Sequence, residues 1–250
     1  MFRLCIGLVL ALGHTCTALA ADLKVLAPNA AKEAVLEAIS VFEKATGYKV
    51  LVSWSGTEAI TKRVADGEKV DLMVNAAQNI DRQSGDGKLI ASTRTDFARS
   101  GIGVAVPASS PKVDVSTSEA IRALLVSAPS VLVSSGTSGR HMVDMVDMFA
   151  ELGVGEQLKA KTKQPPSGAQ IAESLASGEA TVGFQQVSEL IHAKGIQYLG
   201  PLPADLQNYT VYSAAVHASA TDVEAVKQLL AALRSASVQA VVRSTGMEPM

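Results

Sequence analysis

Residues 23–74 read LKVLAPNAAKEAVLEAISVFEKATGYKVLVSWSGTEAITKRVADGEKVDLMV, and the fold class follows from the pattern of this segment. Short apolar runs, typical of buried strands, stand at residues 23–26, 49–52 and 71–74. Between them lie two helical patterns, an amphipathic one at residues 31–45 that Gly47 ends and a second at residues 57–65. This β-α-β-α-β order predicts a parallel sheet with helices on both faces.

A second alternation of strands and helices begins near residue 100. The apolar runs that predict strands are residues 101–107, 130–133, 180–184 and 209–217. The patterns that predict helices are residues 116–125, 142–152, 171–176, 220–235 and 238–242. The chain therefore contains two sets of α/β elements one after the other.

Two α/β lobes with a ligand cleft between them are the architecture that we predict. Lobe 1 comprises residues 21–98 and 213–250, and lobe 2 comprises residues 99–212, including the crossover strands. In parallel-rich sheets of this kind, ligands bind at the carboxyl ends of strands, against the first turns of helices.

The first twenty residues have the organisation of a secretory signal peptide. Arg3 gives an early positive charge, an apolar run follows at residues 4–12, and Ala18-Leu19-Ala20 is a cleavage motif of small residues. The apolar run is shorter than the ~20 residues that span a bilayer. We therefore predict a signal peptide at residues 1–20 and a mature chain in the periplasm.

Composition excludes several classes of function. Cys5 and Cys16 both lie in the expected signal peptide, so we expect no disulfide, no thiolate nucleophile and no cysteine-ligated metal in the mature chain. The formal net charge is −2 and the sequence has no basic tract, which argues against a nucleic-acid partner. No second long apolar stretch predicts a membrane span, and a monomer is the expected state.

Four loops rich in small and hydroxyl residues should meet at the cleft. They are residues 27–32, 53–57, 75–78 and 134–141. Backbone N–H groups and hydroxyls at the start of a helix are typical of an anion site, although the same residues also serve as helix caps. The residues of these loops that we expect to bind substrate are Asn29, Ala30, Ser55, Gly56, Thr57, Asn75, Ser138 and Gly139.

Charged and amide side chains extend this set. Arg140 can hold a carboxylate through two parallel hydrogen bonds, and Arg99 and Ser100 stand where the chain should cross between lobes. A solvated position is the alternative for both arginines. Gln186 ends a predicted strand, and its amide faces either the cleft or the surface. We expect Arg99, Ser100, Arg140 and Gln186 to bind substrate.

Motifs for metals, phosphates and serine nucleophiles are missing from the sequence. No spacing of His, Asp and Glu predicts a metal site. The string at residues 136–140 lacks the lysine of a phosphate-binding loop and the spacing of a Gly-x-Ser-x-Gly nucleophile. His141 can act as an acid or base because its charge changes near neutral pH, with an exposed or capping histidine as the alternative. We expect neither a metal nor a cofactor.

Four segments together resemble the type II periplasmic solute-binding proteins, in their molybdate-binding branch. They are VLAPNAAKEA from residue 25, FEKATG from residue 42, SGT from residue 55 and DGEKVDL from residue 66. The resemblance runs along the whole mature chain. It implies the two-lobed fold of that family, with crossover strands near residues 99–105 and 203–212.

Two departures from the molybdate binders bear on the ligand. Ala30 stands where those proteins usually carry a serine, and Gln186 stands where they carry a tyrosine. Arg99, Arg140 and Lys32 offer full positive charges instead, which favours a larger organic anion with more than one carboxylate. The segment ARSGIGVAV, residues 98–106, is similar to a divergent branch of the family that includes an exported aconitate isomerase.

The resemblance leaves two functions open. The favoured one is an exported isomerase that interconverts trans- and cis-aconitate by an allylic proton shift without a cofactor, with His141 as the first candidate base and Lys32 and Glu58 next. The alternative is a periplasmic receptor that delivers a small anion, a polycarboxylate rather than molybdate, to an ABC importer. Both need the same cleft, and only the isomerase needs a base.

Overall fold

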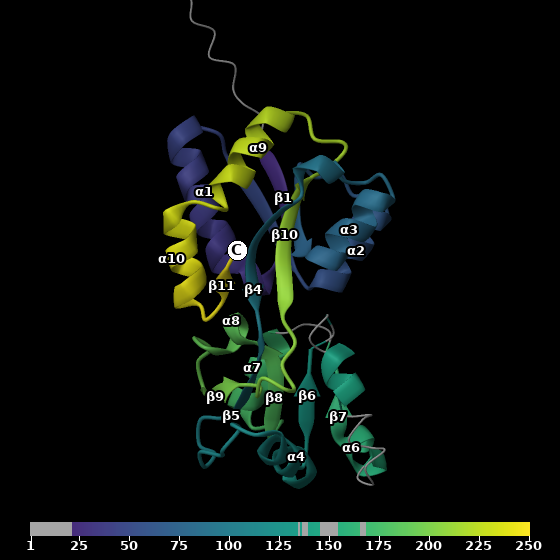
Figure 1. The fold of residues 1–250 in the computed structure, drawn as a ribbon, viewed down its shortest axis with the longest axis vertical. Helices are drawn as coiled ribbons and strands as arrows, with labels where there is room; N and C mark the ends of the chain where they lie inside the picture. Colours follow the sequence, from purple (N-terminus) through teal and green to yellow (C-terminus); the bar gives the residue numbers. More distant parts are fainter. Residues whose placement is uncertain (1–21, 135, 137–139, 146–154, 166–168) are drawn as a thin grey trace, which may run out of the picture.

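The computed structural model describes residues 22–134, 136, 140–145, 155–165 and 169–250. The expected signal peptide, Ser138 and Gly139 lie outside the described residues. Figure 1 shows two α/β lobes joined by the long strands β4 and β10, which run side by side toward the second lobe. In the described part of the chain, no helix is long and apolar enough to cross a membrane.

Lobe 1 is built on a sheet of strand order β11-β4-β10-β3-β1-β2. Its strands are β1 (Leu23–Pro28), β2 (Val50–Ser55), β3 (Leu72–Ala76), β4 (Thr95–Ser100), β10 (Thr210–Val216) and β11 (Glu248–Pro249). β1 is parallel to β2 and β3, as the β-α-β-α-β pattern predicts. The returning strand β10 is antiparallel to β3 and β4, so the sheet is mixed.

Helices cover both faces of the lobe 1 sheet (Figure 1). They are α1 (Lys32–Thr46), α2 (Thr57–Ala65), α3 (Ala77–Gly85), α9 (Val223–Ala232) and α10 (Ala236–Ser244), with 3-10 turns η1 (Asn29–Ala31) and η2 (Ala91–Thr93). Phe42 of α1 lies in the core on the face covered by α1, α9 and α10. Ile60 and Ile80 pack with Met73 on the opposite face, under α2 and α3. Burial of apolar residues on both sides explains why β1 and β3 are almost continuously hydrophobic.

Lobe 2 is built on a sheet of strand order β7-β6-β8-β5-β9. Its strands are β5 (Ile102–Pro107), β6 (Val131–Val133), β7 (Thr162–Lys163), β8 (Val182–Gln186) and β9 (Ile196–Pro201). Its helices are α4 (Ser118–Ser127), α6 (Gly155–Lys161), α7 (Ala169–Ser177) and α8 (Val187–Leu190), and residues 140–145 are also helical. β6 is parallel to β7 and β8, whereas β5 is antiparallel to β8 and β9. The predicted α/β class with two lobes is confirmed, with mixed rather than purely parallel sheets.

Gln207 joins the two segments that connect the lobes. Its amide oxygen accepts from the backbone N–H of Ile102 at 2.7 Å, and its amide nitrogen donates to the carbonyl of Ile102 at 3.0 Å. The side chain therefore pairs with Ile102 as a neighbouring strand would. The predicted lobe boundaries, between residues 98 and 99 and between 212 and 213, fall within β4 and β10 just beyond this link.

Gly183 is a sensitive position in the lobe 2 core. A Cβ atom there would lie 2.6 Å from Cγ2 of Ile171 and 2.8 Å from Cδ1 of Leu175, both fully buried on α7. We expect Gly183→Ala to lower the free energy of unfolding by about 1–3 kcal/mol through overpacking, measured by urea denaturation. Gly85→Ala is the matched control, because nothing lies within 4 Å of its Cβ. Equal stability of the two variants would contradict this packing.

Candidate functional site

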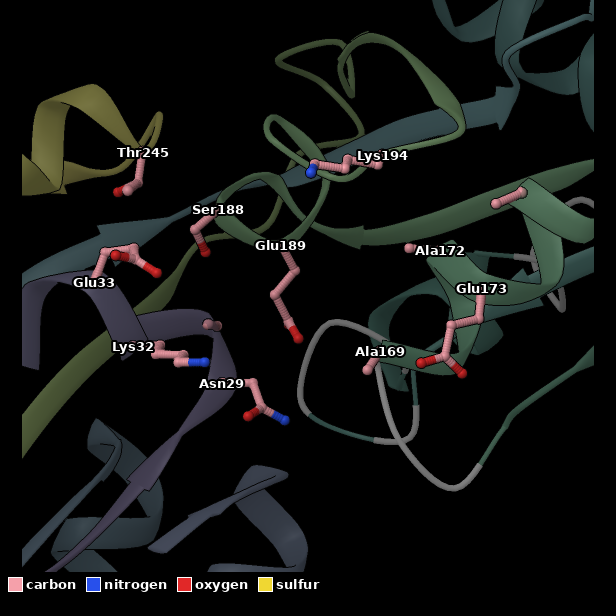
Figure 2. A pocket seen from close by; sticks show the side chains of 12 residues that line it. Asn29, Lys32, Glu33, Ala169, Ala172, Glu173, Ser188, Glu189, Lys194 and Thr245 are labelled. Atoms are coloured by element: carbon pink, nitrogen blue, oxygen red, sulfur yellow. The ribbon is translucent and has the colours of Figure 1, made fainter. Parts of the chain in front are cut away.

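A cavity of about 400 Å³ lies between the lobes, at the point where η1 and α1 of lobe 1 face α7 and α8 of lobe 2 (Figure 2). Its lining residues are Asn29, Ala30, Lys32, Glu33, Ala169, Ala172, Glu173, Ala176, Ser188, Glu189, Lys194 and Thr245. We refer to it as the first cavity. It brings together three residues predicted from the sequence, Asn29, Ala30 and Lys32, with side chains of the opposite lobe.

Glu189 of α8 is the most unusual titratable group in the first cavity. Burial raises the pKa of its carboxyl group from the ordinary value of 4.5 to about 7. Among the described residues, no hydrogen bond or ion pair reaches this carboxylate. Burial and the Glu189 charge together also raise the pKa of Tyr212 on β10, so that phenol stays protonated. A carboxyl group that exchanges a proton near neutral pH has the property of a general base.

Lys32 and Asn29 approach the same space from lobe 1. Figure 2 shows that the ammonium of Lys32, the amide of Asn29 and the carboxylate of Glu189 all point into the space between η1 and α7. The Lys32 Nζ atom lies 5.9 Å from the centre of the Trp54 ring, a cation–π contact that holds the side chain over β2. The cavity thus combines the ammonium of Lys32, the amide of Asn29 and the proton-exchanging carboxyl group of Glu189, and its lining also includes Lys194, Glu33 and Glu173.

Two buried polar atoms beside Glu189 have no hydrogen-bond partner among the described residues. They are Oε1 of Gln186, at the end of β8, and Oγ of Ser188. The other end of the Gln186 amide is occupied, because Nε2 donates to Thr210 Oγ1 at 2.9 Å. Buried polar atoms normally have partners, and of these two residues only Ser188 lines the first cavity, where a ligand can supply the missing partner.

The predicted residues of the second loop lie at the start of α2, and Asn75 of the third loop forms hydrogen bonds that hold this start in place. Ser55 ends β2, Gly56 caps α2 and Thr57 begins it. Asn75 is fully buried, and its Nδ2 atom donates to the Thr57 carbonyl and to Thr61 Oγ1, each at 3.0 Å. These bonds use the Asn75 amide to fix the start of α2 rather than leave it free for a ligand. None of these residues lines the first cavity.

Arg140 and Glu58 form an ion pair between the lobes. Nη1 of Arg140 donates to Oε1 of Glu58 at 3.0 Å. Close by, Gly136 lies so near Thr57 that a Cβ atom would stand 2.8 Å from its hydroxyl. The structure thus brings together two predicted site residues, with Glu58 as the partner of Arg140. It places both in contact between lobes rather than in the first cavity.

His141 lies in a second cavity of about 620 Å³ on another part of the lobe boundary. The lining residues are Gln78, Asn79, Arg82, Arg140, His141, Asp144 and Asn208. Nε2 of His141 is 2.8 Å from the carbonyl oxygen of Leu206, so this nitrogen carries the proton and donates it. The predicted base is therefore separated from Lys32 and Asn29, which line the first cavity.

Arg99 and Ser100 lie on β4 at the crossing between lobes. The Arg99 guanidinium pairs with Glu248 of β11 and stands over the Tyr209 ring, 4.6 Å from its centre. Ser100 is fully buried and donates to the Gly101 carbonyl at 3.3 Å. Neither residue lines the first or second cavity. Within the described residues, no group of three His, Cys, Asp or Glu side chains could hold a metal ion.

The Arg140–Glu58 pair is half-exposed, with 52% and 39% of the two side chains accessible. Exposed ion pairs contribute little, so we expect Arg140→Ala to change the free energy of unfolding by less than about 1 kcal/mol in urea denaturation. Glu58→Gln is the matched variant and should give a change of similar size. A loss above about 2 kcal/mol would show that the pair is a main support of lobe contact. Substrate binding by Arg140 stays a prediction.

Sequence reasoning missed Glu189 and Ser188. A single glutamate after a short strand is a common pattern, and its unusual pKa comes from burial in the folded chain. The nearest available signal was the predicted substrate ligand Gln186, which directly precedes α8 in the chain.

The sequence and the fold are similar to those of known proteins that share the two-lobed fold. Aconitate isomerase of a Pseudomonas species is 29% identical over 233 residues, 91% of this chain and 88% of the relative. The molybdate-binding protein ModA of Azotobacter vinelandii is 25% identical over 250 residues, 96% of each chain. The solved structure of the periplasmic molybdate-binding protein of Azotobacter vinelandii has a TM-score of 0.74 at 18% identity, covering 90% of this chain and 98% of that one.

A family profile matches almost the whole described chain. The family is described as bacterial extracellular solute-binding protein, and the match covers residues 23–248. The two-lobed fold and the cavity between the lobes agree with it, as does the resemblance carried by the segments around residues 25, 42, 55 and 66. The chain therefore belongs to the bacterial extracellular solute-binding protein family.

Proposed function

We propose that this protein is a periplasmic isomerase that interconverts trans- and cis-aconitate without a cofactor. The observation that carries the proposal is Glu189, a carboxyl group with a pKa of about 7 in the first cavity, with no partner among the described residues. The isomerase needs a base of this kind, whereas a receptor that only captures an anion does not. The 29% identity to an aconitate isomerase supports the same reaction.

The reaction needs one proton to leave carbon and one to return. In its ionised form, Glu189 takes a proton from the methylene carbon of aconitate, and the C–H electron pair enters the allyl system. The protonated Glu189 then returns a proton to the other end of the allyl anion, where a new C–H bond forms. The double bond moves by one position, and its geometry is set by the rotation of the allyl anion before reprotonation. No redox change occurs.

In this proposal, Lys32 and Asn29 stabilise the negative charge that develops on the substrate during the proton transfer. When the methylene proton leaves, negative charge spreads into the attached carboxylate. An ammonium and an amide N–H already directed into the cavity stabilise that charge without reorganising in the transition state. In this proposal Glu189 takes the role of base first assigned to His141, because His141 lines the second cavity and donates to Leu206.

Conversion of trans-aconitate by the purified mature protein, followed by chromatography with no cofactor added, tests the proposal. The expected result is formation of cis-aconitate until a constant ratio of isomers is reached from either side. In D₂O, the product should gain deuterium at carbon. Absence of conversion, together with tight binding of trans-aconitate in calorimetry, would contradict the isomerase.

That second outcome would make the protein a receptor for a polycarboxylate anion. The family description favours this alternative, since it names solute binding rather than catalysis. An ABC permease would then be the partner. A thermal-shift comparison of aconitate with molybdate would separate the carboxylate receptor from a molybdate receptor, with stabilisation by molybdate alone pointing to the latter.

A further inference from the structure

Ser188 presents a hydroxyl that the fold leaves without a partner. Its Oγ atom is buried, and none of the described residues forms a hydrogen bond with it. The other such atoms belong to Gln83, Ser84, Gln186 and Gln197. None of those residues lines the first or second cavity, whereas Ser188 lines the first. This combination of burial, lack of a partner and position beside a cavity separates Ser188 from the rest.

The surroundings of Ser188 indicate the chemistry of its missing partner. Figure 2 shows its hydroxyl directed toward the space that Lys32 and Asn29 face from the opposite lobe. A hydroxyl, an ammonium and an amide N–H can all donate hydrogen bonds to one oxyanion. α8 also contacts η1, so Ser188 and Asn29 belong to elements that meet across the boundary of the lobes. A carboxylate is the group that suits three such donors.

We infer that Ser188 is a substrate ligand that binds the same carboxylate as Lys32, from the other side of the cleft. The inference rests on the proposed function for the identity of the substrate. Ser188, Lys32 and Glu189 line the same cavity, so we assign to Ser188 and Lys32 the carboxylate attached to the carbon that loses its proton to Glu189. The site therefore takes acids whose exchanged C–H bond is adjacent to a carboxylate, and it selects against their esters and amides.

Calorimetry with propane-1,2,3-tricarboxylate tests this role, because that saturated probe cannot isomerise. Ser188→Ala should weaken its binding about tenfold to a hundredfold, the loss expected for a hydrogen bond to a charged group. Lys32→Met should also weaken binding, and the double variant should lose less than the product of the two single losses, since both residues serve one carboxylate. Ser177→Ala, an exposed serine of α7, is the matched control and should bind as wild type does.

The melting temperature distinguishes binding from a structural role. Because Oγ of Ser188 has no partner to lose, Ser188→Ala should melt at or above the wild-type temperature. A Ser188→Ala variant that binds the probe within twofold of wild type would overturn the inference, as would a fall in melting temperature that accounts for the lost affinity. Wild-type protein that fails to bind the probe would overturn it too. Binding without conversion of trans-aconitate would instead overturn only the isomerase proposal.

Discussion

Glu189→Gln should abolish the interconversion of aconitate isomers while leaving binding of the substrate intact. The amide keeps the size of the side chain and removes its capacity to accept the proton. Loss of a positioned base typically lowers kcat by about 10²–10⁴-fold, and we expect a fall of about 10³-fold at pH 8. Steady-state kinetics measure kcat, and calorimetry measures the affinity for trans-aconitate. Affinity should stay equal or increase, since one negative charge is removed from an anion site.

Glu173→Gln is the matched control for this experiment. Glu173 also lines the first cavity, but its side chain is exposed. It should keep its activity within a few-fold of wild type. The pH profile of wild-type kcat/KM should rise with pH and level off above about 7, because Glu189 must be ionised to act as a base. A Glu189→Gln variant that retains a tenth or more of wild-type kcat would assign the base to another residue.

The same carboxyl group should make the folded protein less stable as pH rises. In the folded chain the pKa of Glu189 is about 7, whereas its ordinary value is 4.5. As pH rises, the unfolded chain therefore releases this proton at a lower pH than the folded chain does. The contribution of Glu189 to stability is fully present below about pH 4.5 and is lost as pH rises through about 7. We expect a loss of about 3 kcal/mol across that window, at about 1.36 kcal/mol for each unit by which the pKa values of the folded and unfolded chains differ.

Urea denaturation of wild type and Glu189→Gln between pH 4.5 and 8.5 measures this loss. The variant should lack it, so the difference in unfolding free energy between the two proteins should grow from pH 5 and become constant above about pH 7.5. Glu173→Gln should follow wild type at every pH. A parallel pH dependence of wild type and Glu189→Gln would contradict the raised pKa. Greater stability of an inactive variant is the expected pattern where a functional group is retained at a cost to folding.

Local patterns predicted most of the elements but not all of their pairings. α2 has the bounds that the sequence predicts, residues 57–65, since a hydrophobic face and a glycine before it are local signals. β9 was missed, and the antiparallel β10 was recognised as a strand without its direction. Strand direction depends on where a distant segment docks. α4 begins at Ser118, two residues later than the predicted helix at residues 116–125, because the Thr117 side chain caps it by accepting from the N–H of Ala120.

Of the candidate site, only the residues from lobe 1 could be predicted from the sequence. Asn29 and Lys32 line the first cavity because they follow a parallel strand at the first turn of a helix, a position that sequence order determines. Asn75 occupies an equivalent position, yet its amide is used to hold α2. The composition of a loop cannot tell these two uses apart. The raised pKa of Glu189 depends on its burial in the folded chain, which no sequence window shows.

The pairing of Gln207 with Ile102 bears on how the molecule opens. Two independent connections would let one lobe twist as well as swing relative to the other. Because the Gln207 side chain forms two hydrogen bonds with Ile102, we expect the two connecting segments to move together as one unit. A pair of linked segments permits a hinge motion between the lobes and resists rotation of one lobe about the long axis of the connection. For the proposed isomerase, we expect Ser188 and Lys32 to return to the same relative position each time the lobes close, so that the substrate-binding geometry is restored.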